Sequence, residues 1–284
     1  MTTRISITGE LGSGKSTAAK YLAHKLGIEF LSTGNFQRDM AAKLGISTLE
    51  LNHRADNDPS IDEEIDNRTR ALEKSDRSFS IDSRLAWFFL PSSYKVFLVC
   101  PPEVAARRVI GQERVSESYL SPADAVQQLQ SRHASERVRF LKTYGVLQGH
   151  YRNYNLVVDT TSAKAEEIGD AILATFNQSA PKPHLLAAPK NLFVLPGSAE
   201  DEASPHIEIC CADRLWCVLR GHALLRKVIA AGDSLTPVHL MAQDDETVTP
   251  TQTARSLIER TLDRDMITAW EDQNGFRYAA YPHF

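Results

Sequence analysis

The stretch from Gly9 to Ser16, GELGSGKS, constrains this chain more than any other feature. It fits the pattern G-x-x-x-x-G-K-[ST]; residues 5–8 before it are β-prone, and residues 17–26 after it have the pattern of an amphipathic helix. Glycines between a strand and a helix let backbone N–H groups approach phosphate oxygens. The predicted nucleotide-binding residues are Gly9, Gly12, Ser13, Gly14, Lys15, Ser16 and Thr17. We expect Lys15 to reach the β- and γ-phosphates of a nucleoside triphosphate, and the Ser16 hydroxyl to hold Mg²⁺.

The composition is that of an ordinary globular protein. The chain has 284 residues and a formal net charge of −4, which argues against broad, non-specific binding of nucleic acid. The first 176 residues carry 22 basic and 22 acidic side chains, and the remainder carries 10 and 14. No apolar run approaches the roughly 18 residues of a membrane span, and the predicted first strand leaves no space for a secretory signal. The four cysteines lack C-x-x-C spacing, so we expect reduced thiols and a cytoplasmic location.

Strands and helices alternate through residues 1–176. The β-prone stretches are 5–8, 29–31, 78–81, 95–99 and 155–158, and helical patterns fill the segments 17–26, 35–44, 58–74, 103–110, 122–141 and 165–176. Continuous apolar strands separated by helices predict an α/β fold with a parallel sheet covered on both faces. Residues 177–190 contain three prolines and small residues, and we interpret them as a linker. Residues 191–284 are then a second, smaller α+β domain.

Polar side chains follow the second and third predicted strands, where ligands of a parallel sheet bind. Asp82 stands at the end of the third strand and is predicted to orient a water bound to Mg²⁺, so Ser16 and Asp82 are the candidate metal residues. Arg38 offers a bidentate fork to an acceptor phosphate, and Arg84 is expected to face the same acceptor. A later series of arginines suits a lid that closes over phosphates; its members are Arg107, Arg108, Arg114, Arg132, Arg137 and Arg139.

With these residues in view, residues 1–176 resemble the nucleoside monophosphate kinases, most closely the short, archaeal-type cytidylate kinases. The blocks that carry the resemblance follow the family's order: GELGSGKST at 9–17, STGNFQR at 32–38, IDEEID at 61–66, SRLAW at 83–87, then Arg132, Ser135-Glu136, Arg139-Phe140 and Tyr144-Gly145. The resemblance implies a P-loop kinase fold and transfer of the γ-phosphoryl group of Mg-ATP to a nucleoside monophosphate, with cytidylate as the first acceptor to consider.

The same resemblance assigns roles to individual residues. It implies that Ser32, Thr33, Arg38 and Arg84 line the acceptor site and that Arg107, Arg114, Arg132 and Arg139 belong to the lid region. From the resemblance and the residue patterns together, we predict that Asp62 and Arg139 also bind the acceptor, and that the catalytic residues are Lys15, Asp82, Arg107, Arg114 and Arg132. Two positions depart from the family: Ser83 stands where a glycine is usual, and Leu147 stands where an aspartate usually follows the Tyr-Gly pair. Both departures lie on the acceptor side.

Several of these residues also have a plain structural interpretation. Arg38 and Arg84 would otherwise form surface ion pairs. Asp62 and Asp66 are four residues apart on a charged helix, and a solvated face is favoured over recognition of a base. About half of the six lid-region arginines are expected to contact phosphates, and Arg137 is expected to be only solvated. Trp87 and Phe88 are expected in the core and not as a stacking platform.

The second domain has one ordered stretch. Residues 215–219 are β-prone, a Gly-His pair and a helix follow, and residues 236–240 are β-prone again. This unit faintly resembles the core of ParB-like and sulfiredoxin-like domains, with Arg220 in place of the usual aspartate before the Gly-His pair. The cysteines at 210, 211 and 217 lack zinc spacing and are expected to be buried thiols.

The leading functional hypothesis is a phosphotransferase that uses ATP and Mg²⁺ and acts on a small nucleotide. A second hypothesis keeps the fold and changes the acceptor to a 5-hydroxymethyl pyrimidine nucleotide, with DNA as a substrate; the acidic second domain argues against it. A third is a nucleotide-switched binding module whose second domain contacts a partner. The sequence does not determine the oligomeric state.

Overall fold

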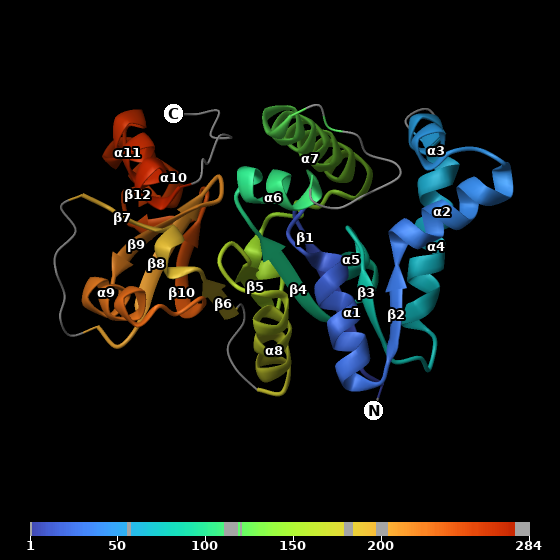
Figure 1. The fold of residues 1–284 in the computed structure, drawn as a ribbon, viewed down its shortest axis with the longest axis horizontal. Helices are drawn as coiled ribbons and strands as arrows, with labels where there is room; N and C mark the ends of the chain where they lie inside the picture. The colour runs from blue at the N-terminus through green and yellow to red at the C-terminus, as the bar shows by residue number, and fades with distance from the viewer. Residues whose placement is uncertain are drawn as a thin grey trace.

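The computed structural model describes residues 2–55, 58–110, 119, 121–178, 184–196 and 204–275. One mixed sheet runs through almost the whole molecule, with strand order β2-β3-β1-β4-β5-β6-β10-β8-β9-β7 (Figure 1). Its strands are β1 (Arg4–Gly9), β2 (Glu29–Ser32), β3 (Phe79–Asp82), β4 (Tyr94–Val99), β5 (Leu156–Asp159), β6 (His184–Ala187), β7 (Leu192–Val194), β8 (Ile207–Ala212), β9 (Leu215–Arg220) and β10 (Thr236–Gln243).

The strands β2, β3, β1, β4, β5 and β6 are all parallel to one another. The helices of this half are α1 (Lys15–Leu26), α2 (Thr33–Leu44), α3 (Thr48–Ala55), α4 (Pro59–Glu73), α5 (Ala86–Phe89), α6 (Pro102–Ile110), α7 (Pro122–Tyr144) and α8 (Ala165–Phe176), with a 3₁₀ turn at Tyr151–Asn153. Continuous apolar strands alternate with helices here because a parallel sheet must be covered on both faces. The predicted α/β fold with a parallel sheet is confirmed.

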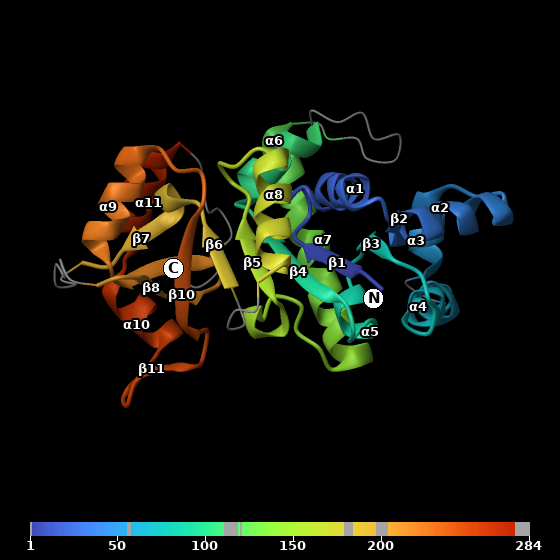
Figure 2. The same ribbon diagram turned by 90° about the horizontal axis from the view of Figure 1, so that it is seen from below.

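The two faces of the parallel sheet have separate cores. On one face, α1 and α8 lie side by side (Figure 2) and pack Leu22 and Ile172 against Ile5, Ile7 and Leu98 of the strands, all fully buried. The other core contains Trp87, Phe97, Tyr151 and Tyr154. Helices α6 and α7 lie over the end toward which β2 and β3 run (Figure 1). The ends of the parallel strands and these two helices therefore enclose the site described below.

The predicted linker at 177–190 is wrong in its second half. Residues 184–187 form β6, which pairs parallel with β5 and antiparallel with β10. Pro189–Asn191 forms a 3₁₀ turn, and Leu185, Ala187 and Ala188 are buried. Burial alternates along β6, so Leu185 and Ala187, which lie in the stretch interpreted as a linker, fill the core. The sheet therefore continues from the first half of the chain into the second without a break.

The C-terminal part has helices on both faces of its strands. These are α9 (His222–Ala231), α10 (Ala254–Thr261) and α11 (Arg264–Asn274); β11 (Thr247–Thr249) and β12 (Gln252–Thr253) form a separate hairpin. Figure 2 shows α9 on one side and α10 on the other. The predicted strand, Gly-His turn, helix and strand are confirmed as β9, Gly221-His222, α9 and β10. Gly221 has φ of +86°, and a Cβ there would lie 2.3 Å from the His206 carbonyl oxygen, so glycine is required.

Other expectations can be checked directly. All four cysteines are free and buried, as predicted. Trp87 is buried, whereas Phe88 is 40% exposed, so the prediction that both belong to the core is confirmed only for Trp87. Within the described residues, no helix is both long and apolar enough to cross a membrane.

Candidate active site

The phosphate loop connects β1 to α1 and lies tightly against its neighbours. Gly9 has φ of +149°, and a Cβ there would lie 2.2 Å from the Leu98 carbonyl oxygen. A Cβ on Gly12, which has φ of +74°, would lie 2.7 Å from the Ala105 carbonyl oxygen. These two glycines let the loop pass between β4 and α6 at a distance that no side chain permits.

Lys15 is the first residue of α1 and is partly buried in the loop. Its Nζ donates to the carbonyl oxygen of Glu10 at 2.6 Å. Burial is the largest cause that lowers the pKa of Lys15 to about 7; the nearby Arg84 lowers it further, and Asp82 and Glu136 oppose the change. A buried ammonium without a matched anion is unfavourable. The loop is therefore prepared for an anion that pairs with Lys15.

Ser16 and Asp82 come together from α1 and the end of β3. The Ser16 hydroxyl donates a hydrogen bond to the Asp82 carboxylate. A hydroxyl and a carboxylate are oxygen ligands of the kind that Mg²⁺ prefers, and Mg²⁺ usually takes its remaining ligands from water and phosphates. The two predicted metal residues thus fit the ion.

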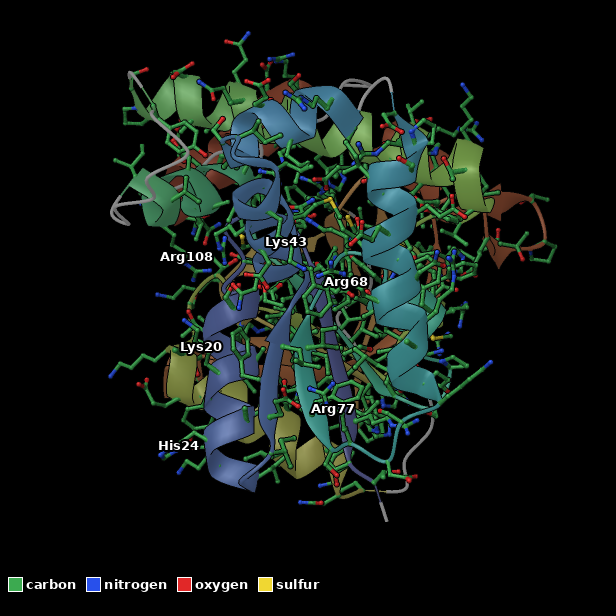
Figure 3. The ribbon with its side chains drawn as sticks, turned by 90° about the vertical axis from the view of Figure 1, so that its right-hand side faces the viewer. Lys20, His24, Lys43, Arg68, Arg77 and Arg108 are labelled. Carbon is green, nitrogen blue, oxygen red and sulfur yellow. The ribbon has the colours of Figure 1, made fainter. Side chains whose placement is uncertain are left out.

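A cavity of about 1690 Å³ extends from the phosphate loop to α2, α4 and α7. This volume exceeds the roughly 300–1,000 Å³ of a typical single-ligand pocket, so it has room for a donor and an acceptor together. Among the described residues, the charged side chains that line it are Lys15, Lys20, Arg38, Arg70, Arg84, Arg108, Arg132, Arg139 and Lys142, with Asp62, Glu63, Asp66, Asp82 and Glu136. Figure 3 shows Arg108 and Lys20 on the same side of the molecule, along α1. Positive side chains outnumber negative ones, as suits phosphate ligands.

Most of the predicted site residues line this cavity. They are Gly12, Ser13, Gly14, Lys15, Ser16, Thr17, Ser32, Thr33, Arg38, Asp62, Asp82, Arg84, Arg132 and Arg139. Gly9 is not among them, but its carbonyl oxygen accepts a hydrogen bond from Arg84 at 2.9 Å. Predicted site residues from Gly12 to Arg139 thus lie together around one cavity.

Three arginines of the acceptor side are held by carboxylates. The Nε of Arg84 lies 3.4 Å from one oxygen of Glu136, and the Nε of Arg132 lies 3.1 Å from the other. Arg139 lies 3.6 Å from Asp62. Burial raises the pKa of Glu136, but Arg84 and Arg132 together bring it below its ordinary value. These pairs keep the guanidinium groups at the cavity wall.

Two predicted catalytic arginines, Arg107 and Arg114, are not among the described residues that line the cavity. Arg107 is 58% exposed, bonds to Glu103 and to the Gly275 carbonyl oxygen and is not among the cavity-lining residues, and its catalytic role in the lid stays a prediction. Consecutive residues of a helix point about 100° apart, and on α6 it is Arg108 that faces the cavity. Arg108 also donates to the hydroxyl and carbonyl oxygens of Thr160. Arg114 lies outside the described residues.

Sequence reasoning missed several cavity residues. Asp66 was favoured as part of a solvated face, but it is only 8% exposed and accepts a hydrogen bond from the Tyr144 hydroxyl. Burial raises the pKa of Asp66 above its ordinary value. Glu136 lies in one of the segments that resemble the kinase family, but the sequence predicted no role for it. For Glu136 the available signal was Phe140, four residues later on the same helix face. Asp66 has no apolar residue three or four positions away, so helical spacing gave no signal that its face turns inward.

Ser83 has a structural role. It is 4% exposed, and its hydroxyl accepts from the backbone N–H groups of Leu85 and Ala86, at 3.3 and 3.1 Å. The backbone N–H of Ala86, the first residue of α5, thereby has an acceptor, although the N-cap residue Leu85 makes no side-chain cap. The serine at this position supports the backbone that carries Arg84.

The fold and the site define a class. A parallel sheet with a phosphate loop after its first strand, a Ser–Asp pair for a metal and arginines around a cavity large enough for two ligands are the parts of a P-loop nucleotide kinase. The comparisons with known proteins narrow this class. The profile described as "Cytidylate kinase-like family" matches residues 4–162, more than half of the chain, and the protein belongs to this family. It is a nucleotide kinase-type phosphotransferase.

Named relatives support the assignment. Cytidylate kinase of Methanobrevibacter smithii is 33% identical over 171 residues, which are 60% of this chain and 96% of that protein. Cytidylate kinase of Sulfolobus acidocaldarius is 34% identical over 62% of this chain and 94% of its own length. An S-adenosylmethionine-dependent nucleotide dehydratase of Lacinutrix mariniflava is 33% identical, but this chain covers only 37% of it. The first two relatives match the first part of the chain almost end to end.

Among solved structures, a shikimate kinase from Bacteroides thetaiotaomicron matches 62% of this chain and 99% of its own, with 16% sequence identity and a TM-score of 0.47. An uncharacterized protein from Eubacterium ventriosum matches the same share with 20% identity and a TM-score of 0.48. The faint ParB-like and sulfiredoxin-like resemblance of the C-terminal part stays a prediction.

Proposed function

We propose that this protein transfers the γ-phosphoryl group of Mg-ATP to the phosphate of a pyrimidine nucleoside monophosphate, with CMP as the first acceptor. The observation that carries the proposal is the single cavity that joins Lys15, Ser16 and Asp82 to the arginines of α2, α7 and the loop after β3. Phosphoryl transfer needs positioning and neutralisation of charge, not covalent help from the protein. This cavity supplies both.

The donor end binds the triphosphate. Backbone N–H groups of the phosphate loop surround the phosphates, and Lys15, whose ammonium has further donors beside the one bonded to the Glu10 carbonyl, pairs with the β- and γ-phosphates. Ser16 and Asp82 would hold Mg²⁺, which neutralises charge on the phosphate oxygens. Arg108, fixed by Thr160 and part of the cavity wall, adds positive charge beside α1.

The acceptor end binds the monophosphate. Arg38 and Arg139 line it and have partners that an incoming phosphate can replace: Arg38 donates to the Asn35 side chain, and Arg139 pairs with Asp62. Arg84 is held more firmly, by the Gly9 carbonyl and Glu136, and lies between the two ends. We propose that Arg84 contacts the phosphoryl group during its transfer, because a fixed positive charge at that position stabilises the transition state most.

ADP release with Mg-ATP and a panel of acceptors tests the proposal. The panel contains CMP, dCMP, UMP, AMP, and duplex DNA with or without 5-hydroxymethyl pyrimidines. Turnover on CMP or dCMP that falls by about 10²–10³ in Lys15→Ala, the loss typical of removing one electrostatic contact, supports the proposal. Arg137→Ala is the matched control, since Arg137 is exposed on α7 and does not line the cavity.

Other outcomes would overturn the proposed acceptor. Turnover on DNA with hydroxymethyl bases but not on CMP would assign a modified nucleotide in DNA. Slow ATP hydrolysis that no acceptor accelerates would favour a nucleotide-switched binding module. A cytoplasmic location remains a prediction from cysteine usage.

A further inference from the structure

The turn between β8 and β9 reaches from the C-terminal part to the phosphate loop. It consists of two residues, Asp213 and Arg214, with φ of 46° and 75°. A two-residue hairpin turn with positive φ at both positions favours Asn-Gly or Asp-Gly. A non-glycine residue in this region costs about 1–2 kcal/mol. Arg214 therefore occupies a position that backbone conformation alone would give to glycine.

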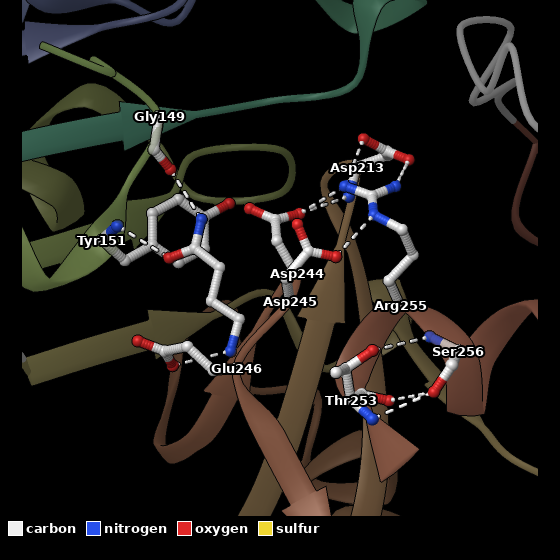
Figure 4. A network of polar contacts seen from close by, with 10 residues as sticks. Gly149, Tyr151, Asp213, Asp244, Asp245, Glu246, Thr253, Arg255 and Ser256 are labelled. Carbon is white, nitrogen blue, oxygen red and sulfur yellow. Dashed lines mark hydrogen bonds and ion pairs between the residues drawn. The ribbon is translucent and has the colours of Figure 1, made fainter. Parts of the chain in front are cut away.

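A cluster of charged residues holds this turn in place. The Arg255 guanidinium on α10 pairs with the Asp213 carboxylate and lies 3.1 Å from Asp244 and 3.5 Å from Asp245 (Figure 4). The Asp213 N–H donates to the Asp244 carboxylate at 3.3 Å. Asp244 has φ of 52°, so all three non-glycine residues with positive φ in the described chain belong to this turn and its support. Strained residues of this kind persist where the surroundings over-determine them, often at functional sites.

Arg214 pairs with Glu10 of the phosphate loop. Its Nε lies 2.7 Å from the Glu10 carboxylate, and the two side chains are 27% and 8% exposed. The other Glu10 oxygen accepts from the Cys100 N–H at 3.3 Å. Burial raises the pKa of Glu10, while Arg214 and Lys15 oppose the change. Breaking a buried ion pair by removing one partner is strongly destabilising, because the remaining charge has no compensation.

Glu10 connects this ion pair to the nucleotide site. Its carbonyl oxygen accepts from Lys15 Nζ at 2.6 Å and from the Ser13 hydroxyl at 2.8 Å. Arg214 thus holds, through its side chain, the residue whose backbone holds Lys15. It also lies close enough to α7 to lower the pKa of His133, although burial is the larger cause. Arg214 therefore lies near both the phosphate loop and α7.

We propose that Arg214 is a positioning residue of the nucleotide site, through which the C-terminal part completes the phosphate loop and strengthens binding of Mg-ATP. The inference rests on the proposed function in one respect only, that the loop binds a nucleoside triphosphate. Arg214 touches Glu10 and not the phosphates, so its effect belongs to binding of ATP and not to recognition of the acceptor. Coupling of this kind is reciprocal: bound ATP must stabilise the β8–β9 turn by the same free energy.

Calorimetric titration with Mg-ATP tests the proposal. Arg214→Met is expected to raise the Kd for Mg-ATP by about 5- to 150-fold, the range typical of coupled sites, while the KM for the acceptor stays within a few fold. Arg214→Lys keeps the charge and is expected to recover much of the affinity. Arg220→Met is the matched control, because Arg220 lies at the far end of β9, the strand that follows the turn, is 69% exposed and is 3.9 Å from Glu208. A folded Arg214→Met protein with unchanged ATP affinity would overturn the proposal.

A measurement on the unaltered protein covers the case in which Arg214→Met does not fold. Hydrogen exchange of residues 212–216 is expected to slow when Mg-ATP binds, because the nucleotide stabilises Glu10 and its partner. Unchanged exchange there, with exchange slowed in the phosphate loop, would contradict the inference. The Kd for Mg-ATP and the hydrogen exchange are both measured without an acceptor. A failure to phosphorylate CMP would therefore count against the proposed function and leave this test intact.

Discussion

The Ser16 hydroxyl and the Asp82 carboxylate form a hydrogen bond at the junction of α1 and β3, 66 residues apart in the chain. Asp82→Asn replaces one carboxylate oxygen of the proposed metal ligand by an amide nitrogen and removes the negative charge. We expect kcat to fall by about 10²–10³, as for the loss of one strong electrostatic contact, and the Mg²⁺ concentration for half-maximal activity to rise. A Mg²⁺ titration of activity measures both. Equal Mg²⁺ dependence in Asp82→Asn and the unaltered protein would exclude Asp82 from the metal site.

The pKa of Lys15 predicts uptake of a proton when ATP binds. Burial lowers this pKa to about 7 in the free protein, so Lys15 is half neutral at pH 7 and mostly neutral at pH 8. Pairing with the phosphates favours the ammonium and raises the pKa again. With Mg²⁺ in excess, calorimetry in buffers of different ionisation enthalpy should show proton uptake that grows from pH 6 to pH 8, and ATP affinity should decline over the same interval.

Lys15→Met provides the control for this titration. It has no group to protonate, so its weaker ATP binding should show neither the proton uptake nor the decline with pH. If the unaltered protein and Lys15→Met take up the same number of protons at pH 8, another group is responsible.

The hydrogen bond from Tyr144 to Asp66 predicts a stability effect at the acceptor end. Tyr144→Phe leaves a carboxylate oxygen of Asp66 without its donor, and Asp66 is only 8% exposed. Loss of a partner for a buried polar group costs about 1–3 kcal/mol. The pKa of Asp66 is already raised by burial, so its charged form opposes folding above that pKa and the penalty should be larger at pH 8 than at pH 5. Thermal unfolding at both pH values measures the difference; an equal loss at both would contradict it.

Substitution of Ser83 is expected to lower thermal stability without changing the KM for ATP. Ser83→Ala removes the acceptor for two backbone N–H groups at the start of α5, and leaving a buried donor without a partner costs about 1–3 kcal/mol. Because Ser83 bonds to backbone and not to the charged cavity residues, we expect Tm to fall while the KM for ATP is unchanged. A change in KM for the acceptor larger than the change in stability explains would show that Ser83 also contacts the substrate.

Sequence patterns were sufficient for what local chemistry determines. The phosphate loop, the strand ends at Ser32 and Asp82 and the alternation of strands and helices each follow from residues close together in the chain. The features that sequence patterns did not predict depend on packing between residues far apart in the chain. Leu185 and Ala187 resembled a linker because nothing near them shows that β5 and β10 lie on either side. Likewise, no local signal distinguishes Arg107 from Arg108, and the pairing of Glu10 with Arg214 joins residues about 200 positions apart.

The continuous sheet predicts that the two halves of the chain unfold together. Gln243 of β10 accepts from the Tyr151 N–H at 2.8 Å and donates to the Gly149 carbonyl oxygen at 2.7 Å (Figure 4). The Trp216 indole donates to the Tyr151 hydroxyl at 3.0 Å, inside a core shared by β4, β5, β8 and β9. Separation of the halves would expose this core and leave buried polar groups unpaired. We therefore expect one cooperative transition with equal calorimetric and van't Hoff enthalpies.

Tryptophan fluorescence can follow each half separately. Trp87 reports on the first half and Trp270 on the second, so variants that keep only one of them should give superimposable unfolding curves. Gln243→Ala should shift both curves by the same amount, because it removes a contact that belongs to neither half alone. A chain that ends at residue 178 would expose Val157 and the edge of β5, and should precipitate. Two resolved transitions, or a soluble and active 1–178 chain, would mean that the sheet joins two independent folding units.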